Sequence, residues 1–198
     1  MADRRAFLSA SAAAAVAGPL FGTPASAEAA EPGTAGQAAP FGLRPQPPDR
    51  DLKKVLREID PRRIERIVRR LAGFGTRHTL SSQDDPVRGI GAARDWIYEQ
   101  MLGYAEASHG RMTVEKQTFV QPVSPRVPVP TPITNIIATL RGTTDPARVY
   151  VVTGHYDSRV SDVMNATADA PGADDDASGV AAVMEMARVF ATRDTEAT

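Results

Sequence analysis

A short, almost uninterrupted run of apolar residues, Val149 to Val152, constrains the fold of this chain more than any other feature. A run of this length without polar alternation is typical of a strand that is covered on both faces. Segments with helical periodicity stand before and after it, so helices alternate with strands along the chain. The pattern predicts an α/β layered fold in which residues 148–154 form a central strand.

Capping signals and periodicity predict the elements around that strand. Asp60 and Pro61 have the form of an N-cap followed by proline at the first helical position. Asp85 and Pro86 repeat this form at the start of a second helix, whose expected inner side carries Ala93, Ile97, Met101 and Tyr104. The expected helices cover about 61–72, 85 onward and 178–192, and the expected strands cover 113–120, 135–140 and 148–154.

The first 50 residues are expected to lie outside the fold. Residues 1–27 have the parts of a secretory signal: a charged start, a short Ala-rich apolar stretch and a small-x-small ending. Arg4-Arg5 followed by Phe-Leu is similar to the twin-arginine export motif, with an ordinary Sec signal as the alternative. Residues 28–50, rich in Ala, Pro and Gly, are expected to form a linker. We therefore expect an exported protein, periplasmic or extracellular, with its domain over 51–198 and no membrane span in the mature chain.

Composition limits the chemistry of that domain. A net charge of -1 argues against nucleic-acid binding, because neutralising phosphates needs a surplus of Lys and Arg. The sequence has no cysteine, which excludes disulfides, thiolate ligands and cysteine nucleophiles. It has three histidines, so a metal site would depend mainly on carboxylates. We interpret His78 and His109 as solvated loop residues. No feature indicates an oligomeric state.

Candidate metal ligands follow the predicted central strand. His155 and Asp157 come directly after it, and Asp174, Asp175 and Asp176 precede the last helix. Ligands of open α/β sheets bind beyond the carboxyl ends of strands, and imidazole with carboxylate is a ligand mix of hydrolytic zinc sites. Residues two apart in an extended segment project to the same side, so Asp157 can fix the tautomer of His155. The alternative is that the aspartates only cap the last helix.

A calcium loop is the other alternative for these acids. Residues 174–179, with Glu185 at the twelfth position, nearly fit the loop of an EF-hand. An EF-hand needs an entering helix, and residues 168–173 contain Pro and Gly where that helix would lie. We therefore interpret Glu185 as an exposed or partly buried helix residue.

Two strings resemble the opening motifs of the co-catalytic di-zinc aminopeptidases, the twenty-eighth metallopeptidase family, which is related to glutamate carboxypeptidase and glutaminyl cyclase. Residues 151–158 read Val-Val-Thr-Gly-His-Tyr-Asp-Ser, and residues 170–181 read Ala-Pro-Gly-Ala-Asp-Asp-Asp-Ala-Ser-Gly-Val-Ala. The resemblance implies that His155 ligates one zinc ion, that Asp157 orients His155, and that Asp175 bridges two zinc ions. It also implies a cis peptide bond after Asp175.

The same resemblance covers residues 51–198 and implies a layered helix/sheet/helix zinc-exopeptidase-like fold, with only its first strands and helices present. It implies a zinc-dependent metallopeptidase acting on peptides, with aminopeptidase as the leading class and carboxypeptidase or glutaminyl cyclase as sister chemistries. The family's Glu-Glu motif, with the general base, and its later Asp and His ligands have no counterpart here. The chain is therefore expected to be truncated and inactive alone, and a non-catalytic exported fragment or binding module is the second alternative.

Overall fold

The computed structural model describes residues 49–198, so the expected signal over 1–27 and nearly all of the expected linker lie outside the described residues. The first helix, α1, begins at Arg50, and the Asp49 carboxylate accepts hydrogen bonds from the backbone N–H groups of Asp51 and Leu52. Helical structure thus starts at the end of the segment expected to be linker. The elements in order are α1 (Arg50–Glu58), α2 (Pro61–Ala72), α3 (Ile90–Glu106), β1 (Met112–Gln121), β2 (Thr131–Leu140), the π-helical turn η1 (Ala173–Ala177) and α4 (Ser178–Ala191).

Helix α2 has the bounds that its capping pattern predicted. The Asp60 carboxylate accepts a hydrogen bond from the backbone N–H of Arg62 at 2.8 Å, and Pro61 occupies the first helical position. Ile67 and Leu71 on its inner side are buried. The predicted helix over 61–72 is therefore confirmed.

Helix α3 begins later than the sequence predicted. The Asp85 carboxylate accepts hydrogen bonds from the backbone N–H groups of Val87 and Arg88, which makes a local turn, and the helix begins at Ile90. Its predicted inner side is buried and contributes to one hydrophobic core with residues of α2, α4 and β1: Ala93, Ile97, Met101 and Tyr104.

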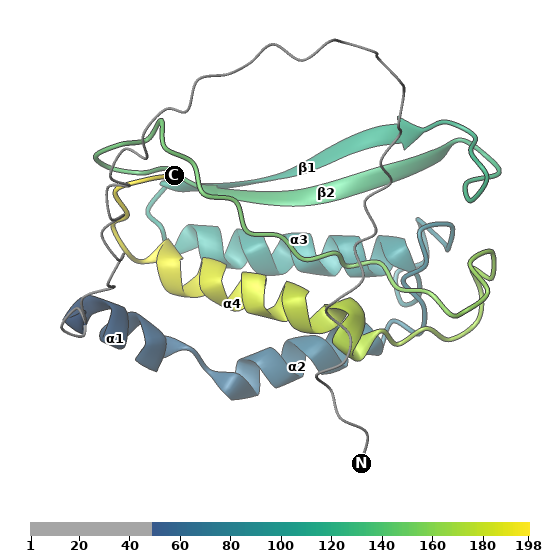
Figure 1. The fold of residues 1–198 in the computed structure, drawn as a ribbon, viewed down its shortest axis with the longest axis horizontal. Coiled ribbons are helices and arrows are strands. Elements are labelled where there is room, and N and C mark those ends of the chain that lie inside the picture. The colour runs from purple at the N-terminus through teal and green to yellow at the C-terminus, as the bar shows by residue number, and fades with distance from the viewer. Residues whose placement is uncertain (1–48) are drawn as a thin grey trace, which may run out of the picture. The chain divides into compact units, whose positions relative to one another are not determined.

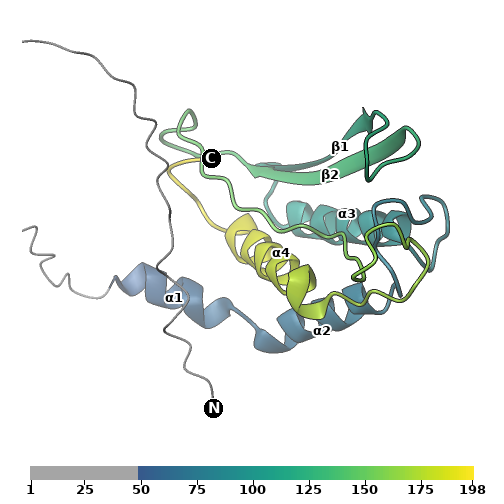
Figure 2. The same ribbon diagram turned by 45° about the vertical axis from the view of Figure 1, so that its right-hand side comes forward.

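The two strands form an antiparallel pair, with a register that runs from Met112 opposite Leu140 to Gln121 opposite Thr131. Figures 1 and 2 show this sheet above α3 and α4, with α2 on the side of these helices away from the sheet. The mixed α/β class is confirmed, and within residues 49–198 the helices cover one face of the sheet. In the same part of the chain, every helix is too short or too polar to cross a bilayer.

The segment predicted as the central strand is not a strand in this structure. Residues 148–154 are irregular, and their apolar side chains are exposed: Val149 60%, Tyr150 72%, Val151 78% and Val152 55%. The backbone hydrogen bonds of this segment lie at its first residues: Arg148 N–H donates to Asp145 O (3.1 Å), Tyr150 N–H donates to Thr198 O (2.8 Å), and Arg148 O accepts from Thr198 N–H (2.9 Å). The prediction was wrong because strand propensity needs neighbouring strands for pairing and burial.

Candidate metal centre

Two loops meet beside the first turn of α4. The first contains His155 and follows Gly154, where a Cβ would lie 2.8 Å from the backbone nitrogen of Val180. The second contains Asp175 and follows Gly172, which has φ +43° and where a Cβ would lie 2.6 Å from the backbone oxygen of Asp175. Glycine at both positions allows the backbones to approach this closely.

His155 lies between two carboxylates. Its Nδ1 is 3.0 Å from Asp157 Oδ1, and its Nε2 is 3.0 Å from Asp175 Oδ1. A hydrogen bond from Nδ1–H to Asp157 selects the tautomer in which Nε2 carries a lone pair, and that nitrogen faces Asp175. The hydroxyl of Thr79 donates to the second carboxylate oxygen of Asp157 at 3.3 Å. The structure therefore brings all three sequence-predicted site residues together.

The surroundings of His155 are strongly negative. Burial opposes its protonated form, but the hydrogen bond with Asp157 and the charges of Asp157, Asp176 and Asp175 outweigh burial and raise the pKa of His155 above its ordinary value. The side chains of His155 and Asp175 are 58% and 89% exposed. The site is thus open to solvent and favours a cation.

The three consecutive aspartates have different environments. Asp176 accepts hydrogen bonds from Gly179 N–H (2.9 Å) in the first turn of α4 and from His155 N–H (3.1 Å). Asp174 is exposed, and its backbone oxygen accepts from the Ser178 hydroxyl. The helix-capping alternative therefore describes Asp176, whereas Asp175 faces His155. The peptide bond between Asp175 and Asp176 is cis.

The geometry of His155 and Asp175 fits a shared zinc ion. Two ligands at about 2.0–2.1 Å from a tetrahedral zinc ion lie about 3.3 Å apart. The observed separation of Nε2 and Oδ1 is 3.0 Å, and both donor types are ordinary zinc ligands. Within residues 49–198, His, Cys, Asp and Glu side chains nowhere gather in a group of three or more that could hold a metal ion. The described chain thus offers two ligands for such an ion.

The EF-hand alternative does not fit the structure. Glu185 is buried, with its side chain 2% exposed, which corrects the expectation of an exposed or partly buried residue. Its Oε1 accepts from Asp60 N–H (2.8 Å) and from Arg188 Nη2 (2.7 Å), so the carboxylate binds α2 and its own helix. Helix α3 ends at Glu106, and no helix of the described residues enters the loop at 174–179.

His78 was also interpreted wrongly. It is 5% exposed, and its Nδ1 accepts a hydrogen bond from Leu80 N–H (3.0 Å) while Nε2 lies 3.1 Å from Val163 O. Both ring nitrogens therefore contact loop backbone and not the candidate ligands. His109 is exposed, with φ 54°, as expected for a loop residue.

Sequence reasoning missed the residues that hold the two loops together. Arg77 is 0% exposed and Ser158 is 5% exposed, and they hydrogen-bond to each other and to both loops. Ser158 belongs to the first motif, which was a usable signal. Arg77 stands in Gly-Thr-Arg-His, where nothing in the local pattern distinguishes it from a solvated arginine.

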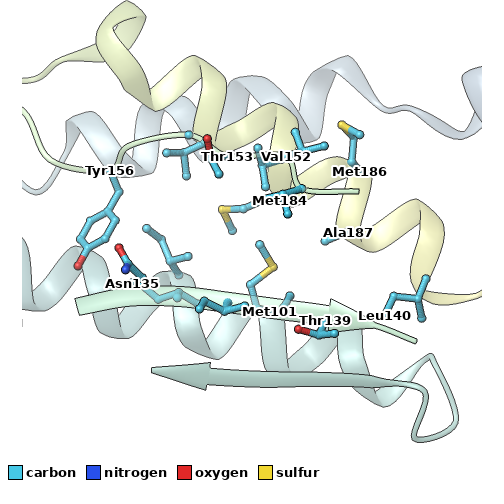
Figure 3. A pocket seen from close by; sticks show the side chains of 18 of the residues that line it. Met101, Asn135, Thr139, Leu140, Val152, Thr153, Tyr156, Met184, Met186 and Ala187 are labelled. Carbon is cyan, nitrogen blue, oxygen red and sulfur yellow. The ribbon is translucent and has the colours of Figure 1, made fainter. Parts of the chain in front are cut away.

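An apolar groove of about 1360 Å³ extends from the candidate site along β2. Figure 3 shows Leu140 of β2, Met184 of α4 and Val152 of the irregular segment around it. His155, Tyr156 and Asp157 are among the residues that line it, and the Tyr156 hydroxyl donates to Thr134 O of β2 at 2.7 Å. Tyr156 thereby ties the first loop to the sheet.

Comparison with known proteins gives one family model over the candidate site and several similar proteins. Residues 135–198 match the model of peptidase family M28. A probable zinc metalloprotease of Pyricularia oryzae is 61% identical over 163 residues, which are 81% of this chain and 32% of that protein. Probable zinc metalloproteases of Leptosphaeria maculans and Pyrenophora tritici-repentis are 54% and 53% identical, over 77% and 79% of this chain and 36% and 32% of their own lengths. The chain spans about a third of these curated relatives. The family model over residues 135–198 and these relatives support an assignment to peptidase family M28.

Proposed function

We propose that this chain contributes two zinc ligands, His155 and Asp175, to an exported metallopeptidase that hydrolyses peptide bonds. The observation that carries the proposal is the 3.0 Å separation of His155 Nε2 and Asp175 Oδ1, with Asp157 behind the imidazole. The names of the relatives support zinc as the metal. The exposed carboxylate of Asp175 would also be the ligand shared with a second zinc ion, as the family resemblance implies.

Zinc in such a site lowers the pKa of a bound water towards neutrality and polarises the substrate carbonyl. The chain's own residues prepare the ligands for it. Asp157 holds the imidazole in the tautomer that presents Nε2, and Asp176 holds the backbone N–H of His155 against the start of α4. Both contacts reduce the motion that metal binding would otherwise have to restrict.

We propose an aminopeptidase as the finer class. The family resemblance supports this class. Carboxypeptidase and glutaminyl cyclase chemistry are the competing outcomes. Each predicts a different preferred substrate, so one protein preparation can distinguish them.

A chimera tests the activity. Residues 28–198 of this chain would replace the aligned segment of the Pyricularia oryzae relative, with which it is 61% identical. We expect zinc-dependent cleavage of leucine anilide and little cleavage of its N-acetylated form. His155→Ala and Asp175→Asn should abolish turnover, while His109→Ala, at an exposed loop position, should not. Equal cleavage of the acetylated substrate would rule out an aminopeptidase, and full activity of both ligand variants would rule out the site.

The 198-residue chain alone is expected to bind zinc without hydrolysing peptides at an enzymatic rate. Its described residues supply two ligands where a zinc site needs three or four, so the ion stays largely hydrated. The measurement is release of nitroaniline from an aminoacyl anilide with added zinc, beside a His155→Ala control. Turnover above that control, abolished by a chelator, would contradict the expectation and show a complete site.

Export is the remaining part of the proposal. Its support is the sequence of residues 1–27, with Arg4-Arg5, an Ala-rich apolar stretch and the small residues that end at Ala27. N-terminal sequencing of secreted protein should begin near Glu28. A mature chain that keeps Arg4-Arg5 would contradict export through a cleaved signal.

A further inference from the structure

A buried arginine joins the two loops of the candidate site. The guanidinium of Arg77 donates to Tyr156 O from Nε (2.6 Å), to Pro171 O from Nη1 (2.8 Å) and to Gly172 O from Nη2 (3.0 Å). Nη1 also donates to Leu71 O at the end of α2 (2.8 Å). One side chain thus contacts the backbone of the loop next to His155, the backbone of the loop before Asp175, and a core helix.

The backbone of Arg77 repeats this connection. Its N–H donates to Ser158 Oγ (3.1 Å) and its carbonyl oxygen accepts from Ser158 N–H (3.1 Å). The Ser158 hydroxyl then donates to Ala170 O at 2.6 Å. The loop that carries His155 is therefore attached to the segment before Asp175 both through the guanidinium and through Ser158.

The contacts of Arg77 need the shape of a guanidinium. Its four side-chain hydrogen bonds go to carbonyl oxygens in different directions, and a planar fork with five N–H donors can serve them together. A lysine ammonium is a single point with three donors and cannot reach the same set. Charge alone would therefore not replace Arg77.

We propose that Arg77 is the positioning residue that sets the separation of His155 and Asp175 for zinc. This inference rests on the proposed function. Tyr156 adjoins His155, and Gly172 begins the turn that carries Asp175, so a shift of either carbonyl moves a ligand. A residue that orients zinc ligands typically changes metal affinity 10–100-fold when it is replaced.

The test measures zinc affinity in the full chain, for variants that alter the two loops and for a control variant that alters the core. Arg77→Lys should raise the zinc dissociation constant by about tenfold or more, measured by competition with a chelating dye. Ser158→Ala removes the two hydroxyl hydrogen bonds of the second connection and should also raise the zinc dissociation constant. Glu185→Ala is the matched control, because it removes buried contacts between α4 and α2 without touching either loop. Its zinc dissociation constant should stay within twofold of the wild type under conditions where each variant is folded.

A second readout does not depend on zinc. The ring nitrogen signals of His155 in ¹⁵N NMR spectra of the zinc-free chain report the Nδ1–H tautomer, and Arg77→Lys should shift them towards those of a free histidine. If the wild type binds no zinc, the proposed function fails, and these signals still decide the role of Arg77. Unchanged signals, or a zinc affinity that falls equally in Arg77→Lys and Glu185→Ala, would overturn the inference.

Discussion

Replacement of the buried Glu185 by alanine should destabilise the fold substantially. Its carboxylate accepts from Asp60 N–H and from two nitrogens of Arg188, and it lies 3.4 Å from Arg63 Nε. Breaking a buried ion pair from one side costs about 3–5 kcal/mol. Arg188 and Arg63 are 29% and 35% exposed, so water can solvate them once the carboxylate is gone.

We therefore expect Glu185→Ala to lower the free energy of unfolding by about 2–3 kcal/mol, of which the Asp60 N–H without its acceptor contributes about 1 kcal/mol or more. Glu185→Gln keeps an acceptor for that N–H and should cost about 1 kcal/mol. Urea unfolding followed by circular dichroism measures both. A loss of less than about 0.5 kcal/mol in the free energy of unfolding of Glu185→Ala would show that these buried contacts do not stabilise the fold as argued.

Glu185→Ala also distinguishes a structural role of Glu185 from a role as a calcium ligand. Here the loss of stability should be identical with calcium and with a calcium chelator, since Glu185 faces α2.

Burial raises the pKa of Glu185, but hydrogen bonds from Arg188 and Asp60 N–H and the charges of Arg188 and Arg63 outweigh it, so the pKa is lowered from 4.5. The stabilisation by its charge is complete above that value and is lost as the pH falls through the folded-state pKa. The difference between the wild type and Glu185→Gln should therefore shrink below about pH 4.5.

Three further outcomes are expected. Asp157→Asn should weaken zinc binding about 10–100-fold in isothermal titration, because the imidazole loses its charged acceptor; an unchanged affinity would exclude the orienting role. Hydrogen bonding from Arg94 is the main cause that lowers the pKa of Asp95 to about 2, with a smaller contribution from Lys116. Stability from Asp95 is thus fully present above about pH 4 and is lost as the pH falls through about 2. Because its side chain is 45% exposed, Asp95→Asn should cost less than about 1 kcal/mol at pH 7 and clearly less at pH 2, by urea midpoints. Val151→Lys should reduce self-association in light scattering at equal stability, because it interrupts an exposed apolar segment, and unchanged scattering would show that association has another source.

The sequence alone determined the parts of this protein that depend on local chemistry. Helix α2 follows from Asp60 and Pro61, whose capping and fixed φ act within one turn. The contact of His155 with Asp157 follows from their spacing of two residues, because such residues project to the same side of an extended segment.

Tertiary structure decided what depends on neighbours far along the chain. Residues 148–154 have the composition of a central strand, but they are irregular because no described strand lies beside them for pairing. Arg77, His78 and Glu185 look like surface residues in sequence and are buried, because partners about 80–130 positions away satisfy their polar atoms. Burial of a polar side chain is favourable only where the fold supplies those partners, and no local pattern contains that information.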